Sequence, residues 1–144
     1  MREATDPAVQ ALLAAAGKAG AVVLYEHWAR RDGDRQNRPE DTHAAQAARL
    51  QASFDRLTRE HGLTSAPVGR VWEKVLREHP EINLYQPDGS HPSPAGAYLA
   101  ACVLYATVYG ESPAGLPATN GVDAKAAAAI RAAAADTSRP AATR

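Results

Sequence analysis

The segment that most restricts the fold is a run of five apolar residues, 21–25, in a chain whose other apolar residues mostly recur at helical spacing. Its short length and β-branched residues predict a strand buried on both faces, as in a parallel sheet. A weaker pattern over residues 64–68 predicts a second strand. No hairpin turn separates the two segments, so we expect an α/β fold with about two parallel strands and flanking helices. Since two parallel strands are marginal alone, the pattern suggests part of a larger sheet.

Apolar periodicity and capping residues predict five helices around these strands. Asp6 and Ser93 are predicted N-caps because each precedes a proline, and Gly62 is a predicted C-cap. The helix after Ser93 is apolar on nearly all sides, which predicts a central, buried helix. The tail after Asp136 is expected to fray. The predicted helices span residues 7–16, 39–61, 69–79, 94–109 and 122–135.

Composition excludes several classes of function. The 144 residues include 16 basic and 16 acidic side chains, and this balance argues against nucleic acid as a partner. Cys102 is the only cysteine, so no internal disulfide can form. No apolar run approaches the ~20 residues of a membrane span. The polar N-terminus is unlike a signal peptide, so we expect a cytoplasmic location for the chain as given, whereas a full-length protein could be secreted.

The sequence Asp88-Gly-Ser-His91 carries the strongest chemical signal. Across a tight turn, the carboxylate of Asp88 can reach one imidazole nitrogen of His91, which fixes the tautomer. The other nitrogen is then free to act as a general base. The alternative is that Asp88 caps the turn and His91 is merely exposed. The neighbouring Ser90 is interpreted as a turn residue rather than a nucleophile.

Other side chains are candidates for the lining of a pocket. Ligands of parallel α/β sheets bind at the carboxyl ends of the strands, where Glu26, His27 and Trp28 follow the first strand. Tyr85 is expected at the mouth of a cleft. A loop pair without a role is an equally acceptable interpretation of Glu26 and His27, and packing is the alternative for Trp28. The histidines form neither His-x-His nor His-Glu-x-x-His, so we expect no metal and no cofactor.

Residues 84–101, Leu-Tyr-Gln-Pro-Asp-Gly-Ser-His-Pro-Ser-Pro-Ala-Gly-Ala-Tyr-Leu-Ala-Ala, resemble the final motif block of the SGNH (GDSL-type) hydrolases. In that family, Asp-x-x-His precedes a helix with a small-residue glycine turn. Residues 23–30 and 66–72 also resemble segments of one branch of the family. The resemblance covers roughly residues 8–117. It implies that residues 1–117 are the C-terminal portion of a flavodoxin-like three-layer α/β/α domain, followed by a helix and tail over residues 118–144.

The resemblance also implies a mechanism. In the family, a serine attacks an ester or thioester carbonyl, a histidine removes the serine proton, and an aspartate orients the histidine. His91 and Asp88 match the last two roles. The family's Gly-Asp-Ser and Gly-x-Asn-Asp blocks, which supply the nucleophile and the oxyanion hole, have no match here. We therefore expect a truncated member that is inactive alone, from a family that acts on acyl esters of small molecules, carbohydrates or lipids.

A second hypothesis assigns no catalysis to the chain. In the family, the blocks that have no match here follow the first three strands of the domain. A domain without those strands would expose a sheet edge and apolar surface, and both favour association. The chain would then be a remnant or interaction module. It would self-associate through the exposed sheet edge or pair with a separate N-terminal half.

Overall fold

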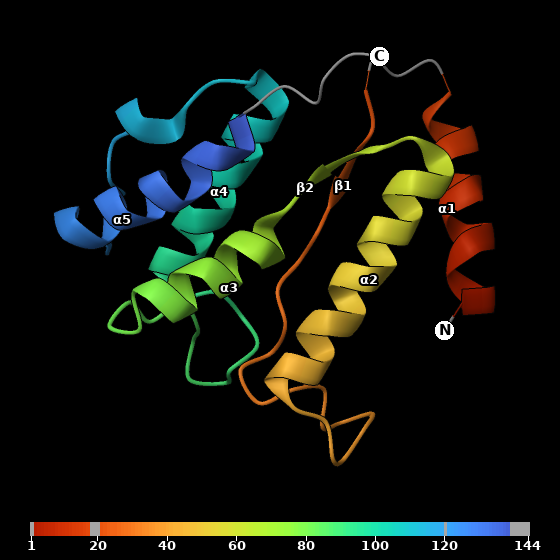
Figure 1. The fold of residues 1–144 in the computed structure, drawn as a ribbon, viewed down its shortest axis with the longest axis horizontal. Helices are drawn as coiled ribbons and strands as arrows, with labels where there is room; N and C mark the ends of the chain where they lie inside the picture. The colour runs from red at the N-terminus through yellow and green to blue at the C-terminus, as the bar shows by residue number, and fades with distance from the viewer. Residues whose placement is uncertain (1, 18–20, 120, 139–144) are drawn as a thin grey trace.

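The computed structural model describes residues 2–17, 21–119 and 121–138 (Figure 1). Strands β1 (Val23–Tyr25) and β2 (Thr64–Ala66) pair in parallel, with Val23 opposite Thr64. This pairing confirms the predicted α/β class and the two parallel strands. The helices are α1 (Arg2–Ala16), α2 (His43–His61), α3 (Val68–Glu78), α4 (Pro94–Tyr109) and α5 (Ala124–Ala135), with short 3-10 helices η1 (Pro113–Gly115) and η2 (Asp136–Ser138).

Helices lie on both sides of the small sheet. Figure 1 shows α1 and α2 on one side of the strands and α3, α4 and α5 on the other. Helices α2 and α4 both contact β2. Strand β1 is only partly buried, and Tyr25 is 39% exposed. The prediction of a strand buried on both faces is wrong, because among the described elements only β2 makes extensive contacts with β1, and no helix covers its faces closely.

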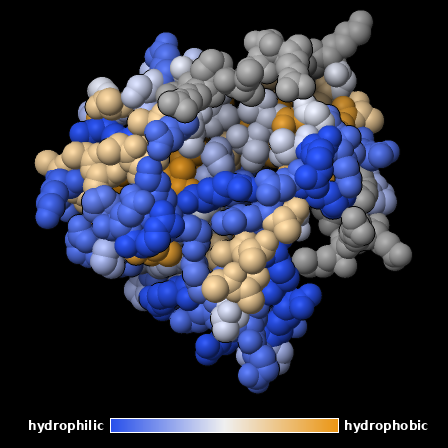
Figure 2. Space-filling view, viewed as in Figure 1, coloured by the Kyte–Doolittle hydropathy of each residue, from blue (hydrophilic) through white to orange (hydrophobic). Residues whose placement is uncertain are grey.

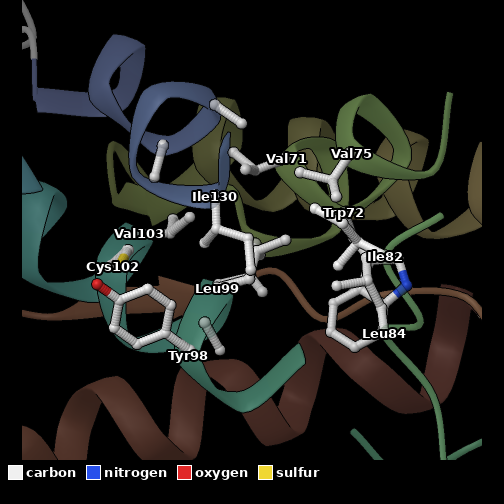
Figure 3. Packing of buried hydrophobic residues seen from close by; sticks show 14 of the residues in the cluster. Val71, Trp72, Val75, Ile82, Leu84, Tyr98, Leu99, Cys102, Val103 and Ile130 are labelled. Carbon is white, nitrogen blue, oxygen red and sulfur yellow. The ribbon is translucent and has the colours of Figure 1, made fainter. Parts of the chain in front are cut away.

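The hydrophobic core lies between α3, α4 and α5. Figure 3 shows the side chains that meet there, among them Val71 and Val75 of α3, Leu99 and Val103 of α4, and Ile130 of α5. Each fully buried side chain of this size stabilises the fold by about 1.5–3 kcal/mol relative to an exposed one. Helix α5 thus packs into the same core as the helices before it.

Helix α4 is central, as predicted, but it is not buried over its whole length. Its residues Val108 and Tyr109 are exposed. Ala106, in the same last turn, is buried, so one side of this turn is covered and the other faces solvent. Ser93 is the N-cap, and its Oγ accepts a hydrogen bond from the Gly96 N–H at 3.1 Å. Gly62 closes α2 in the left-handed conformation, with φ of 63°, as its position after the predicted helix indicates.

Two predicted helix starts are wrong. Helix α2 begins at His43 rather than near residue 39, because the side chain of Thr42 caps it. Helix α1 begins at Arg2, and Pro7 lies inside it. The residues before Pro7 include good helix formers, and a proline near a helix start interrupts few hydrogen bonds. Of the predicted frayed tail, η2 extends to Ser138, and residues 139–144 lie outside the described residues.

Candidate active site

The loop between α3 and α4 folds back on itself as a narrow hairpin. Tyr85 and Pro92 form an antiparallel bridge, and the Gln86 N–H donates to the His91 carbonyl at 2.9 Å. At the tip, the Gly89 N–H donates to the Gln86 carbonyl at 2.9 Å, and Gly89 has a φ of 67°. A glycine adopts this left-handed conformation without steric cost. The turn therefore brings Asp88 and His91 to the same side of the loop.

Asp88 bonds both the turn and the imidazole. Its Oδ1 accepts hydrogen bonds from the backbone N–H groups of Ser90, at 2.9 Å, and His91, at 3.0 Å. Its Oδ2 lies 2.5 Å from Nδ1 of His91. The two interpretations of this aspartate, turn cap and imidazole partner, are thus both satisfied by one carboxylate. These bonds, chiefly the one to the imidazole, lower the pKa of Asp88 to about 2.

The His91 imidazole is held at one nitrogen and open at the other. Its side chain is 73% exposed, and no described residue bonds Nε2. When Nδ1–H donates to the Asp88 carboxylate, Nε2 of the neutral ring has a free lone pair. This arrangement can accept a proton from a hydroxyl group brought to Nε2.

The segment that follows β1 anchors the hairpin loop. The indole Nε1–H of Trp28 donates to the Ser90 carbonyl at 3.1 Å, and the backbone N–H of Arg31 donates to the Gly89 carbonyl at 2.8 Å. The Arg31 guanidinium also donates to the Pro87 carbonyl at 3.2 Å. Backbone carbonyls across the tip of the loop are thus tied to the chain beyond the carboxyl end of β1, the end of a parallel strand where ligands of α/β proteins bind.

Trp28 and Tyr85 support this loop by packing against Trp72 of α3. The Trp28 ring stacks on Trp72, with centroids 4.2 Å apart and planes 7° apart, and Tyr85 meets Trp72 edge-on at 5.1 Å. The Tyr85 hydroxyl donates to the Ala29 carbonyl at 2.8 Å, and burial raises the pKa of Tyr85. Packing therefore accounts for both rings.

The structure places Glu26 and His27 away from the pair of Asp88 and His91. Glu26 is 2% exposed and forms an ion pair with Arg70 of α3 at 3.2 Å. Burial raises the pKa of Glu26, and the Arg70 guanidinium opposes that change. His27 bonds the carbonyl of Trp28 and lies edge-on to Phe54 of α2. Both residues thus contact the helices rather than the hairpin loop.

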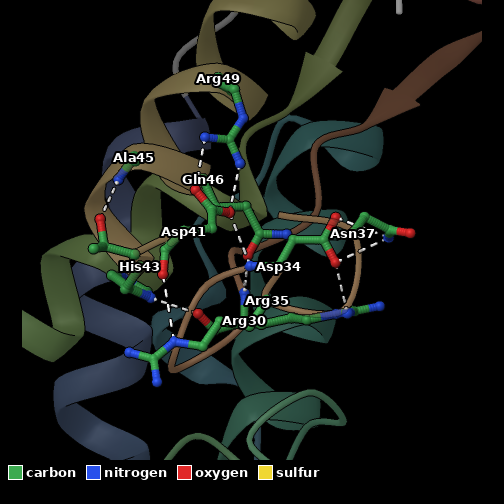
Figure 4. Close-up of polar contacts among 10 residues, drawn as sticks. Arg30, Asp34, Arg35, Asn37, Asp41, His43, Ala45, Gln46 and Arg49 are labelled. Carbon is green, nitrogen blue, oxygen red and sulfur yellow. Dashed lines mark hydrogen bonds and ion pairs between the residues drawn. The ribbon is translucent and has the colours of Figure 1, made fainter. Parts of the chain in front are cut away.

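Sequence reasoning missed the polar network that shapes the loop between β1 and α2 (Figure 4). Asp41 is buried and accepts two hydrogen bonds from the Arg49 guanidinium, at 2.8 and 2.6 Å, and one from the Asp34 N–H at 2.9 Å. These bonds hold the pKa of Asp41 well below its usual range. The only signal in the sequence was an unusual density of Asp and Arg, which is also typical of a solvated loop.

A polar pocket of about 320 Å³ lies between this loop and the hairpin loop. We call it the loop pocket. Asp88 belongs to its lining, so the pocket borders the residue that bonds His91. Its lining residues are Arg30, Asp32, Gly33, Arg35, Gln36, Asp88, Gly89 and Ser90.

The described residues supply no partner that would complete a hydrolytic triad. The Ser93 hydroxyl donates to the Asn83 carbonyl at 2.7 Å, and no described Ser, Thr or Cys side chain is bonded to His91. Within the described ranges, no group of three His, Cys, Asp or Glu side chains is placed to hold a metal ion. None of the described helices is long and apolar enough to cross a lipid bilayer.

Comparisons with protein-family models, with curated proteins and with solved structures found no match for this chain.

Proposed function

We propose that Asp88 and His91 are the acid–base half of an SGNH-type ester hydrolase site, within the C-terminal part of a flavodoxin-like α/β/α domain. The observation that carries this proposal is the Asp88 carboxylate on Nδ1 of His91, at 2.5 Å, with Nε2 open to solvent. The position of the loop beyond the carboxyl end of β1 supports it. The serine would come from a segment outside these 144 residues.

In this proposal, His91 moves the protons and Asp88 stabilises the charge that forms. Nε2 takes the serine proton as the serine oxygen attacks the ester carbonyl carbon. Asp88, already ionised, stabilises the resulting imidazolium and does not accept the proton. Nε2 then returns the proton to the alkoxide that leaves. In the second half, Nε2 removes a proton from the water that attacks the acyl-enzyme, and returns it to the serine oxygen as the acyl–serine bond breaks and the acid leaves.

The decisive test uses two chains. The 144-residue chain is expected to hydrolyse p-nitrophenyl acetate no faster than its His91→Ala variant, because no described serine is bonded to Nε2. The coding DNA just upstream is then read for an in-frame Gly-Asp-Ser block, and the longer protein is expressed. In that protein, His91→Ala is expected to abolish hydrolysis, and Asp88→Asn to lower kcat by about 10⁴-fold.

The matched control is His79→Ala, because His79 is also partly exposed but lies at the end of α3, outside the hairpin loop. Its activity should equal that of the unmodified longer protein. Turnover by the 144-residue chain that disappears in His91→Ala would refute the expectation that this chain is inactive alone. Activity of the longer protein that survives His91→Ala would refute the proposed role of the pair.

The open edge of β1 favours a second candidate, a non-catalytic interaction module. The Glu26 N–H donates to the Ala66 carbonyl, so alternation along the strand turns the N–H groups of Val23 and Tyr25 toward the opposite edge. No described strand pairs with that edge. An unpaired edge is a template for a strand of another chain, including a second copy.

This candidate predicts concentration-dependent association in size-exclusion chromatography with light scattering. Tyr25→Lys places a charge on the exposed edge and is expected to shift the chain to monomer, since edge lysines oppose strand pairing. Tyr25→Phe, which keeps the ring and the N–H, serves as the control and should associate like the original chain. A folded monomer at every concentration would rule out association through this edge.

A further inference from the structure

The loop pocket has a lining that differs from that of an apolar ligand site. Its eight residues include no hydrophobic side chain. Most small-molecule pockets are lined mainly by apolar and aromatic side chains with a few polar groups. A fatty acyl chain placed here would therefore remain in polar surroundings and gain nothing from burial.

The charges of the lining balance one another. Arg30 and Arg35 contribute two positive charges, and Asp32 and Asp88 contribute two negative charges. Arg30 is also neutralised by Asp34, whose Oδ1 lies 2.8 Å from Arg30 Nη1. An anionic ligand would consequently meet carboxylates as well as guanidinium groups, so the pocket offers no net attraction for it.

Several polar groups in the pocket have spare hydrogen-bonding capacity. The Gln36 amide and the Ser90 hydroxyl have no bond within the described structure. The nearest cation to Asp32 is the Arg31 Nε at 3.6 Å, beyond hydrogen-bond length. Arg35 makes a single long bond, from Nε to the Asp41 carbonyl at 3.4 Å. The lining thus offers both donors and acceptors to a ligand.

The walls of the pocket are set in place before any ligand binds. A Cβ on Gly33 would lie 2.7 Å from the Thr42 carbonyl carbon, and a Cβ on Gly89 would lie 3.1 Å from the Arg31 guanidinium. The first contact packs the loop between β1 and α2 against itself, and the second packs the hairpin loop against Arg31. The Asp41–Arg49 pair holds the first loop (Figure 4), and hydrophilic residues cover the lower end of the molecule where that loop lies (Figure 2).

We propose that the loop pocket binds a neutral, hydroxyl-rich group, and that this group is the carbohydrate alcohol part of the ester. The inference rests on the proposed function for its second half, because Asp88 lines the pocket and holds His91. Vicinal hydroxyl groups both donate and accept hydrogen bonds, which fits a lining of amide, carboxylate, guanidinium and hydroxyl groups.

The test is an amide-resolved NMR titration of the 144-residue chain. The probes are the neutral oligosaccharides xylohexaose, cellohexaose and chitohexaose, with trigalacturonate as the anionic probe and octanoate as the apolar one, each at millimolar concentrations. We expect at least one neutral sugar to shift the amides of residues 32–36 and 88–90. Gln36→Ala should weaken this binding by about fivefold, the factor for one lost hydrogen bond.

Arg38→Ala is the matched control, because Arg38 lies on the same loop but does not line the pocket. It should bind like the original chain. The inference is overturned if trigalacturonate or octanoate binds more tightly than every neutral sugar, if no probe shifts these amides, or if the shifts fall elsewhere. Sugar binding does not require hydrolysis, so the His91→Ala variant should bind the sugar as the original chain does. If the longer protein hydrolyses the ester equally well with and without the His91→Ala substitution, the proposed function is refuted, but the binding result still holds.

Discussion

At the scale of the residue, Asp88 determines the chemistry of the hairpin loop. One oxygen accepts two backbone N–H groups and thereby fixes the turn, while the other bonds the imidazole of His91. The same three bonds lower the pKa of the carboxyl group, because each favours its charged form. The turn and the orientation of the imidazole therefore depend on one ionisation.

The ionisation of Asp88 gives a pH-dependent prediction. Its pKa falls from 3.8 to about 2, so its contribution to stability is complete above about pH 4 and is lost as the pH falls through 2. A carboxyl-carbon NMR titration should find this low pKa. His91→Ala should raise the pKa toward 3.8 without reaching it, because the backbone bonds remain. A pKa unchanged by that substitution would mean that the imidazole does not bond the carboxylate in solution.

At the scale of the element, the start of α4 fixes the hairpin loop from behind. Ser93 caps α4 and also donates its hydroxyl hydrogen to the Asn83 carbonyl, so it joins the helix to the chain before the loop. Gly96, one turn later, permits close packing, since a Cβ there would lie 2.3 Å from the Leu84 carbonyl oxygen and 2.5 Å from the Trp72 ring. Both residues serve the contact between α3, α4 and the loop.

The N-cap of α4 is expected to contribute more to the free energy of unfolding than an exposed N-cap does. Ser93→Ala should lower the free energy of unfolding by about 1–2 kcal/mol, because one helix N–H loses its acceptor and the part-buried Asn83 carbonyl loses its donor. Urea denaturation measures the change. Ser112→Ala removes the cap of the short η1, where the hydroxyl is exposed, and should cost less. Equal losses in the two variants would contradict the role given to the Asn83 bond.

The close approach at Gly96 gives a stronger prediction for the same element. Gly96→Ala should destabilise the chain by about 1–3 kcal/mol despite the higher helix propensity of alanine, because the new methyl group overlaps backbone as well as a ring. Thermal unfolding followed by circular dichroism would measure it. Gly115→Ala, where a Cβ meets nothing within 4 Å, is the control and should leave the melting temperature nearly unchanged. A stabilised Gly96→Ala variant would show that this contact is looser than the geometry implies.

At the scale of the whole molecule, the helical core and helix α1 contribute unequally to the free energy of unfolding. Helices α3, α4 and α5 share one buried cluster, whereas α1 is largely exposed and Leu12 is 70% exposed. Ile130→Ala should therefore lower the free energy of unfolding by about 2–5 kcal/mol, and Leu12→Ala should change it by no more than about 0.5 kcal/mol. Chemical denaturation of both variants tests this, and a mild effect of Ile130→Ala would place α5 outside the folding unit.

Much of the local structure could be predicted from the sequence. The α4 cap at Ser93, the C-cap at Gly62 and the segments that became β1 and β2 all have local signals, because caps, turns and strand propensity depend on near neighbours. The pairing of Asp88 with His91 was also predictable, since the two residues lie three positions apart in one tight turn. The starts of α1 and α2 were missed because α1 continues through Pro7, and because Thr42 rather than Pro39 marks the start of α2.

The sequence by itself therefore determined most of the helices, the two strand segments and the hydrogen bonds of the Asp88 turn, all of which depend on residues close together in the chain. Only the tertiary structure decided that Trp28 and Arg31 tie down the hairpin loop, that Asp41 is buried on Arg49, and that a polar pocket forms beside Asp88. These contacts join segments that are distant along the chain or that cross a loop without periodicity. Their energy comes from burial and hydrogen bonds that exist only once the core has brought the segments together, so no local pattern in the sequence predicts them.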